Sequence, residues 1–264
     1  NSEIGLAVGE ESLLYDAEIH EARIAVTHGI GEHWILRATL ASQRYTDGFL
    51  DGFIESFHRT FGFPRGDRGR LDSDGHEIVY ADASGEHVLL DGSLSAVAPL
   101  VLDLAYRRLG ERSEWLCGAT VKAPTSRKTL LADDRALDMS LWIAQQSTDP
   151  ASRWSWGWRA GLMQRGAMQL LERHARDRVG FADGLLAYRL MSNWDVAAQA
   201  QWHTAFYDSS LALLSDAGTL TLSTGWRPAS GWSLRFGVVE DLPAEHAQDV
   251  TMFATFGFAS DNAF

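Results

Sequence analysis

Three segments within residues 216–258 decide the fold: TLTLSTGW at 219–226, WSLRFGV at 232–238 and VTMFATFGF at 250–258. In each segment, apolar residues alternate with polar or small residues. In the first, Leu220 and Leu222 share one face, while Thr221 and Ser223 share the other. This period of two is typical of a β-strand whose two faces lie in different surroundings.

The polar faces of these segments indicate what surrounds the strands. A soluble sheet usually covers its wet face with Lys and Glu, but here Thr, Ser and Gly predominate, which suits the crowded interior of a barrel. Trp226 and Trp232 flank the tight turn at residues 227–231, where a membrane barrel carries an aromatic girdle. The stretch therefore predicts transmembrane strands with their apolar face towards lipid.

Composition narrows the class of protein. The 264 residues suffice for one large β domain. The chain has no run of about 18 apolar residues, which a transmembrane helix would need. The net charge of -12 argues against nucleic acid as a partner. Cys117 is the single cysteine, so no internal disulfide can form, and we interpret it as a small apolar residue.

The alternating pattern predicts twelve strands in all. They cover residues 1–8, 17–28, 33–46, 97–108, 114–124, 135–147, 153–163, 178–190 and 193–206, followed by the three segments of residues 216–258. Their connections are alternately short and long, with residues 9–16 among the long ones. An even strand number with short turns at one rim is typical of bacterial outer-membrane barrels. We therefore expect a 12-stranded antiparallel transmembrane β-barrel, a single domain over residues 1–264, located in the bacterial outer membrane. Both termini should lie at the short-turn, periplasmic rim.

Residues 47–95 interrupt the pattern as an extracellular loop insertion. Apolar residues recur at helical spacing from Leu50 to Phe61, which predicts a short amphipathic helix. Residues 77–80 and 87–90 flank a Gly-containing turn and predict a hairpin. The helix could form a lid over the barrel, or it could lie on the membrane surface or bind a partner.

Several segments resemble one known family. They are ESLLYD at 11–16, GFLDGFIESFH at 48–58, FGFP at 61–64, HTAFYDS at 203–209 and VEDL at 239–242. They are similar to an uncharacterised family of Gram-negative outer-membrane proteins that is filed only as a domain of unknown function. The resemblance covers most of the chain, and it implies a barrel without a known activity. It also implies that a further strand-like segment can precede Asn1.

Charged residues on the polar faces form the first candidate site, inside the barrel. This lumen set consists of Arg23, Arg37, Arg44, Lys122, Asp138, Arg159, Asp195 and Arg235. Rings of charge in a pore select ions, so the set could determine selectivity. Alternatively, the charges pair with one another and close the lumen.

A second candidate site lies where strands meet the long loops. This mouth set consists of Asp47, Asp51, Glu55, His58, His203, Tyr207, Asp208, Glu240 and Asp241. It could bind a cation, a sugar or a lipid headgroup at the extracellular mouth. Alternatively, its members anchor the inserted loop to the barrel by hydrogen bonds.

Signals for catalysis are weak. His203 could act on Ser209 or Ser210, but the sequence has no Gly-x-Ser-x-Gly elbow. His20-Glu21 and His76-Glu77 begin like zinc motifs, but neither has the second histidine. We therefore expect no enzyme, no metal and no cofactor.

The leading functional hypothesis is a narrow, porin-like passive channel for small solutes. The alternative is a structural sleeve or anchor for a protein partner in or beside the barrel, and a lipid-modifying enzyme comes third. Outer-membrane lipid and lipopolysaccharide are the expected surroundings. A soluble β-sandwich is the competing fold, and it would bury the apolar faces of the strands against each other.

Overall fold

The computed structural model describes residues 2–46, 77–85, 87–91, 94–125, 135–167, 171–228, 231–242 and 250–259. Fifteen strands in this part of the chain join one antiparallel sheet. They are β1 (Ser2–Val8), β2 (Glu11–Ile30), β3 (Trp34–Thr46), β4 (Glu77–Ala81), β5 (His87–Asp91), β6 (Leu94–Val97), β7 (Leu100–Leu109), β8 (Ser113–Ala123), β9 (Asp138–Ser147), β10 (Trp154–Gln164), β11 (Arg178–Met191), β12 (Trp194–His203), β13 (Ala217–Trp226), β14 (Trp232–Leu242) and β15 (Val250–Phe258). Two short 3-10 turns, η1 (Glu172–His174) and η2 (Ala212–Leu214), lie in the loops.

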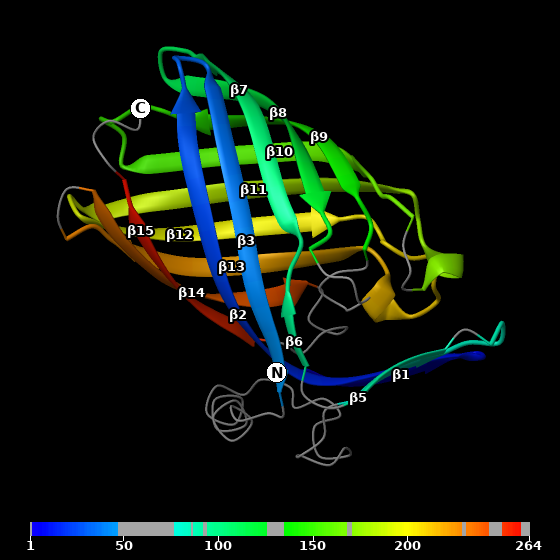
Figure 1. The fold of residues 1–264 in the computed structure, drawn as a ribbon. Helices are drawn as coiled ribbons and strands as arrows, with labels where there is room; N and C mark the ends of the chain where they lie inside the picture. Colours follow the sequence, from blue (N-terminus) through cyan, green and yellow to red (C-terminus); the bar gives the residue numbers. More distant parts are fainter. Residues whose placement is uncertain are drawn as a thin grey trace, which may run out of the picture.

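Eleven long strands form what we call the wall: β2, β3 and β7 to β15. Their order is β15-β14-β13-β12-β11-β10-β9-β8-β7-β3-β2, so each strand pairs with the next one along the meander. The wall curls around a central space, as Figure 1 shows. All twelve predicted segments are strands, which confirms the all-β antiparallel class.

The N-terminal strand departs from the prediction. Residues 9–16 are not a long loop, because a two-residue turn at Gly9 and Glu10 joins β1 directly to β2. Gly9 has a φ of +62°, a conformation that glycine adopts without strain. β2 has 20 residues, or about 65 Å at the usual strand rise, and its first third extends beyond the wall. β1 pairs with that extension, so it lies outside the wall.

The extension of β2 is the centre of what we call the small sheet, of order β5-β4-β2-β1. On one side, Ser12 to Asp16 pair with Ala81 to Glu77 of β4, and on the other side Ser2 pairs with Ala17 of β2. Ser2 therefore lies at the long-loop rim of the wall, and the prediction that both termini lie at the short-turn rim is wrong for the N-terminus. β4 and β5 pair with each other where the sequence predicts a hairpin.

A small hydrophobic core holds the small sheet against two loops. Leu13 of β2 and Tyr80 of β4 pack with Leu171 and Leu211, and Leu211 is completely buried. Leu171 lies between β10 and β11, and Leu211 lies in the loop that follows β12. The small sheet is therefore fixed by packing as well as by strand pairing.

The wall has two edges in the described part of the chain. β15 pairs there only with β14, and residues 18–30 of β2 pair only with β3. The sheet is thus barrel-like, and the described pairs do not join it into the closed ring that the sequence predicts.

The two faces of the wall differ in chemistry, as the alternation predicts. The convex outer face exposes large apolar side chains, among them Ile24 at 74%, Leu141 at 71% and Phe256 at 65% of their surface. The concave inner face carries the polar members of each strand. This distribution excludes a soluble sandwich, whose apolar faces would be buried.

Aromatic side chains mark the short-turn rim of the outer face. They contact one another across neighbouring strands, with ring centroids 4.5–6.3 Å apart. The pairs are Trp34–Tyr106, Trp154–Tyr188, Trp194–Trp226 and Trp232–Phe258. This belt is the aromatic girdle that the sequence predicts at Trp226 and Trp232.

The predicted helix at residues 50–61 lies outside the described residues. Among the described ones, no helix is long and apolar enough to cross a membrane. The single domain predicted over residues 1–264 stays a prediction.

Candidate functional site

The inner face of the wall encloses a polar cavity of about 470 Å³. Strands β2, β3 and β7 to β11 contribute its lining, and their inward positions bring charged side chains from distant parts of the sequence together. Among them are Arg23, Arg37, Lys122 and Arg159 of the predicted lumen set. We call this space the central cavity.

Three of the four basic side chains in the central cavity form close ion pairs. Arg23 contacts Glu21 on its own strand at 2.6 Å. Lys122 contacts Asp138 on the adjacent strand at 2.6 Å, and Arg159 donates to Asp183 of β11 at 2.7 Å. Asp138 therefore belongs to the same network, although its side chain is almost completely buried. The charges that the sequence predicts in the lumen are largely neutralised by pairing.

Aromatic rings support Arg159. Its guanidinium lies 5.9 Å from the Trp142 ring centroid and 5.6 Å from that of Phe181. Trp142 in turn lies over Gly118, where a Cβ atom would meet the indole at 2.5 Å. Gly118 is thus required by the close approach of the ring, and the sequence alone did not single out either residue.

Two other members of the lumen set lie apart from these pairs. Arg37 faces Asp103 in the register of β3 and β7, and both line the central cavity. Asp103 also accepts a hydrogen bond from the Thr120 hydroxyl at 2.5 Å. Arg44 is exposed near the long-loop end of β3 and does not line that cavity.

A second polar cavity, of about 380 Å³, lies at the short-turn end of the inner face. Asp195 and Arg235 of the lumen set line it, together with Arg189 and Arg227, which the sequence analysis did not select. Arg227 was assigned to a turn, and Arg189 belongs to a segment with poor alternation. We call this space the short-turn cavity. The structure thus divides the predicted lumen set between two cavities, except for Arg44, which lines neither.

The described members of the mouth set do not line one common cavity. Asp47, Asp51, Glu55 and His58 lie outside the described residues. His203 is the last residue of β12, and Tyr207 and Asp208 lie on the loop that follows it, whereas Glu240 and Asp241 lie at the end of β14. A third cavity, of about 330 Å³, is lined by His203 but by no other member of the set.

The described contacts of the mouth residues hold loops in place. His203 Nδ1 lies 2.9 Å from the Thr204 carbonyl, and its ring packs on Phe206. The exposed Asp208 accepts a hydrogen bond from Arg176 at 3.0 Å. The described part of the chain contains no group of three or more His, Cys, Asp or Glu residues that could hold a metal.

Glu11 forms the densest polar contact outside the wall. It accepts hydrogen bonds from the Ser209 hydroxyl, from the backbone and hydroxyl of Ser210, and from the Tyr80 hydroxyl. Burial raises the pKa of this carboxyl, but the hydrogen bonds outweigh burial and leave the pKa below its ordinary value of 4.5. Glu11 thus ties the small sheet to the loop after β12.

These contacts do not assemble a hydrolytic site around Ser209. Its hydroxyl donates to Glu11 and accepts from the Leu211 backbone, and the described contacts of the His203 ring lie elsewhere. A serine nucleophile needs a base within hydrogen-bond reach. Within the described residues, the Ser–His pairing that the third hypothesis requires is not formed.

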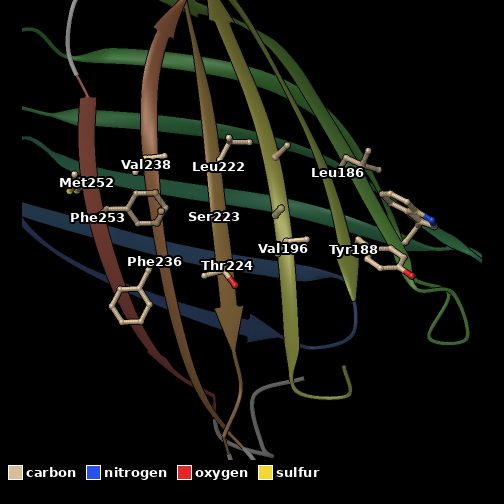
Figure 2. Close-up of a pocket in the computed structure, with 14 residues that line it drawn as sticks. Leu186, Tyr188, Val196, Leu222, Ser223, Thr224, Phe236, Val238, Met252 and Phe253 are labelled. Atoms are coloured by element: carbon tan, nitrogen blue, oxygen red, sulfur yellow. The ribbon is translucent and has the colours of Figure 1, made fainter. Parts of the chain in front are cut away.

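The outer face carries a shallow apolar depression over β10 to β15 (Figure 2). Its volume is about 760 Å³, and aliphatic and aromatic side chains such as Leu186, Leu222, Phe236 and Met252 line it. These residues alternate with the inner-face residues of the same strands, so the depression belongs to the outer face. Its described lining includes no charged side chain, and its polar groups are few, among them the hydroxyls of Tyr188 and Thr224.

Comparison with known proteins gives a family and a fold. The family model described as "Protein of unknown function (DUF3187)" matches residues 7–259. No curated protein matches the sequence. The crystal structure of the COG4313 outer membrane channel from Pseudomonas putida F1 is similar with a TM-score of 0.58 and 12% identity, over 97% of this chain and 87% of that one. The structure described as the CymD monoaromatic hydrocarbon channel has a TM-score of 0.38 and 10% identity, over 96% of this chain and 78% of that one.

Proposed function

The chain belongs to the family described as "Protein of unknown function (DUF3187)", and on that premise we propose that it is a porin-like barrel of the bacterial outer membrane that acts as a narrow passive channel for small polar solutes. The observation that carries the proposal is the contrast between the two faces of the wall. The outer face is apolar and exposed, whereas the inner face is polar and encloses two charged cavities.

Hydrocarbon is the solvent that suits the outer face. Soluble proteins rarely expose contiguous apolar patches larger than a few hundred Å². Here exposed Leu, Ile, Val, Phe and Trp side chains extend along every strand of the wall. The aromatic girdle at the short-turn rim suits the level of the lipid headgroups, with that rim towards the periplasm. Outer-membrane lipid and lipopolysaccharide would then surround the wall.

The inner face suits water and small polar solutes. Paired charges and the ring of Phe181 line the central cavity, and the short-turn cavity lies nearer the short-turn rim of the same inner face. Their volumes of about 470 and 380 Å³ accommodate small molecules. A structural neighbour is described as an outer membrane channel, which agrees with this proposal.

Planar-bilayer conductance of the purified protein tests the channel. We expect small, ohmic conductance steps at high salt. Ser140→Trp should reduce the conductance, because Ser140 lines the central cavity and an indole would fill part of it. Leu141→Trp is the matched control, since the adjacent residue lies on the outer face. Silence at high voltage and high salt, or equal conductance of the two variants and the wild type, would refute the proposal.

The sleeve or anchor function has one observation in its favour. The small sheet projects beyond the wall, and its outermost strands β1 and β5 each have a free edge in the described part of the chain. A partner strand could extend such an edge. Co-purification from native membranes distinguishes the two functions: a stoichiometric companion protein supports the sleeve, whereas a barrel that purifies alone and conducts supports the channel.

A further inference from the structure

The charges of the two inner cavities are balanced differently. In the central cavity each basic side chain has its own carboxylate, because Arg23, Lys122 and Arg159 have separate acidic partners and Arg37 faces Asp103. In the short-turn cavity, Arg227 and Arg235 share the carboxylate of Asp195. Arg189 also faces Asp195 in the strand register, but its described hydrogen bonds go to two carbonyls, so three guanidinium groups surround one carboxylate. Although the whole chain carries a net charge of -12, this cavity has an excess of positive charge.

Asp195 is the shared carboxylate. Arg227 donates to its Oδ2 at 2.8 Å, and Arg235 donates to its Oδ1 at 2.6 Å. The Asp195 side chain is only 7% exposed, whereas those of Arg227 and Arg235 are 52% and 35% exposed. Asp195 therefore lies beneath the two arginines and fixes them, and both arginines line the cavity.

The fold keeps space for this cluster. Gly225 lies opposite Asp195 and Arg235 in the strand register, where a Cβ atom would approach the Arg235 guanidinium to 2.6 Å and the Asp195 carboxylate to 2.8 Å. Arg235 also donates to the Ser223 hydroxyl at 3.0 Å. The position of Arg235 is thus determined by two partners and by the missing side chain of Gly225.

Arg189 adds the third positive group. Its Nη2 donates to the Pro150 and Ser152 carbonyls at 3.0 and 2.8 Å, which position the guanidinium without neutralising it. The other acid that lines the cavity is Asp149, whose Oδ1 accepts a hydrogen bond from the Ala151 backbone in its own turn. With three arginines and two aspartates, the cavity has a net positive charge.

We propose that the short-turn cavity is a binding site for a small oxyanion, a carboxylate or a phosphate, and that it makes the channel anion-selective. Guanidinium groups offer paired N–H donors that match the two oxygens of such an anion. Positively charged linings favour anions in pores. The volume of about 380 Å³ leaves room for a small organic acid or for inorganic phosphate. The selectivity part of this inference rests on the proposed channel function, whereas the binding part does not.

The test combines binding with conductance. Saturation-transfer NMR measures the binding of acetate to the detergent-solubilised protein, and added inorganic phosphate competes for the same site. We expect Arg189→Gln and Arg227→Gln each to weaken acetate binding roughly tenfold, about the effect of one lost charge-assisted hydrogen bond. Arg189→Lys keeps the positive charge but loses the paired N–H donors of the guanidinium, and it should weaken acetate binding to an intermediate extent. Arg176→Gln, at the opposite rim, is the control and should bind like the wild type.

The reversal potential in a KCl gradient provides the second measurement. The wild type should favour chloride over potassium, and the two Gln variants should lose most of that preference. Binding without conductance would refute the channel but keep the anion site. Conductance without an anion preference and without acetate binding would refute the anion site but keep the channel. Displacement by phosphate but not by other carboxylates would identify phosphate as the preferred anion. Equal weakening in Arg176→Gln would show nonspecific attraction and overturn the proposal.

Discussion

The substitution Leu141→Arg tests whether hydrocarbon surrounds the wall. Leu141 lies on β9 between Ala119 of β8 and Leu162 of β10, and 71% of its surface is exposed. Because it is mostly exposed, the loss of packing contributes little. The cost is then almost entirely the transfer of a guanidinium into lipid, about 2–4 kcal/mol for arginine near the bilayer midplane.

Ser140→Arg is the matched control, because the adjacent residue projects from the same strand into the central cavity. There the added charge meets water and the polar lining, and we expect the free energy of unfolding to change by less than about 1 kcal/mol. The two variants add the same side chain one residue apart. They differ only in the face of the sheet from which the added arginine projects.

Reversible unfolding in lipid vesicles, followed by tryptophan fluorescence, measures both free energies. We expect Leu141→Arg to be less stable than Ser140→Arg by about 2 kcal/mol or more. If Leu141→Arg is as stable as the wild type in vesicles, or if it makes the protein soluble without detergent, the outer face is not in hydrocarbon. The assignment of the inner cavities as a channel would then be wrong as well.

Three further predictions concern the small sheet and the inner wall. The pKa of Glu11 is lowered on folding, so its stabilisation is present above its ordinary pKa of 4.5 and is lost as pH falls through the lower folded value. The protection of β1 and β4 from hydrogen exchange, relative to the intrinsic exchange rate at each pH, should therefore fall below pH 4.5 in the wild type and fall less in Glu11→Gln. Leu211→Ala should lower the stability of the small sheet by about 2–5 kcal/mol, and limited proteolysis should then cleave that sheet while the wall stays intact. Gly118→Ala should destabilise the wall by about 1–3 kcal/mol, because a Cβ atom would meet the Trp142 ring and the Leu104 carbonyl, and denaturant unfolding should show the loss.

The alternation of residue types predicted the wall because each strand has one face towards apolar surroundings and one face towards polar surroundings. Leu220 and Leu222 alternate with Thr221 and Ser223 in the sequence, and the same alternation separates the two faces in the structure. The strand positions and the assignment of each face follow from this one local property. The family that the sequence resembles is also the one whose model matches residues 7–259.

The local pattern could not show which strands pair. The extension of β2 does not alternate, because Leu13, Leu14 and Tyr15 are consecutive apolar residues, and the sequence therefore predicted a connection there. Its pairing with β4 depends on residues far away in the sequence. The same limit explains the missed residues of the site. Asp183 and Arg189 lie on β11, whose alternation is poor, and Arg227 was assigned to a turn although its guanidinium reaches Asp195.

The odd number of strands in the wall limits how its two edge strands, β2 and β15, can pair with each other across a seam. Neighbouring strands of the wall run in opposite directions. Because the wall has eleven strands, an odd number, its first and last strands, β2 and β15, run in the same direction. A direct seam between them would be parallel, whereas every described pair is antiparallel. One more strand of opposite direction would give an antiparallel seam and bring the total to twelve, an even number, as is usual for bacterial barrels. Cysteine pairs placed along β2 and β15 would form disulfides across a direct seam, and they would stay reduced across an inserted strand.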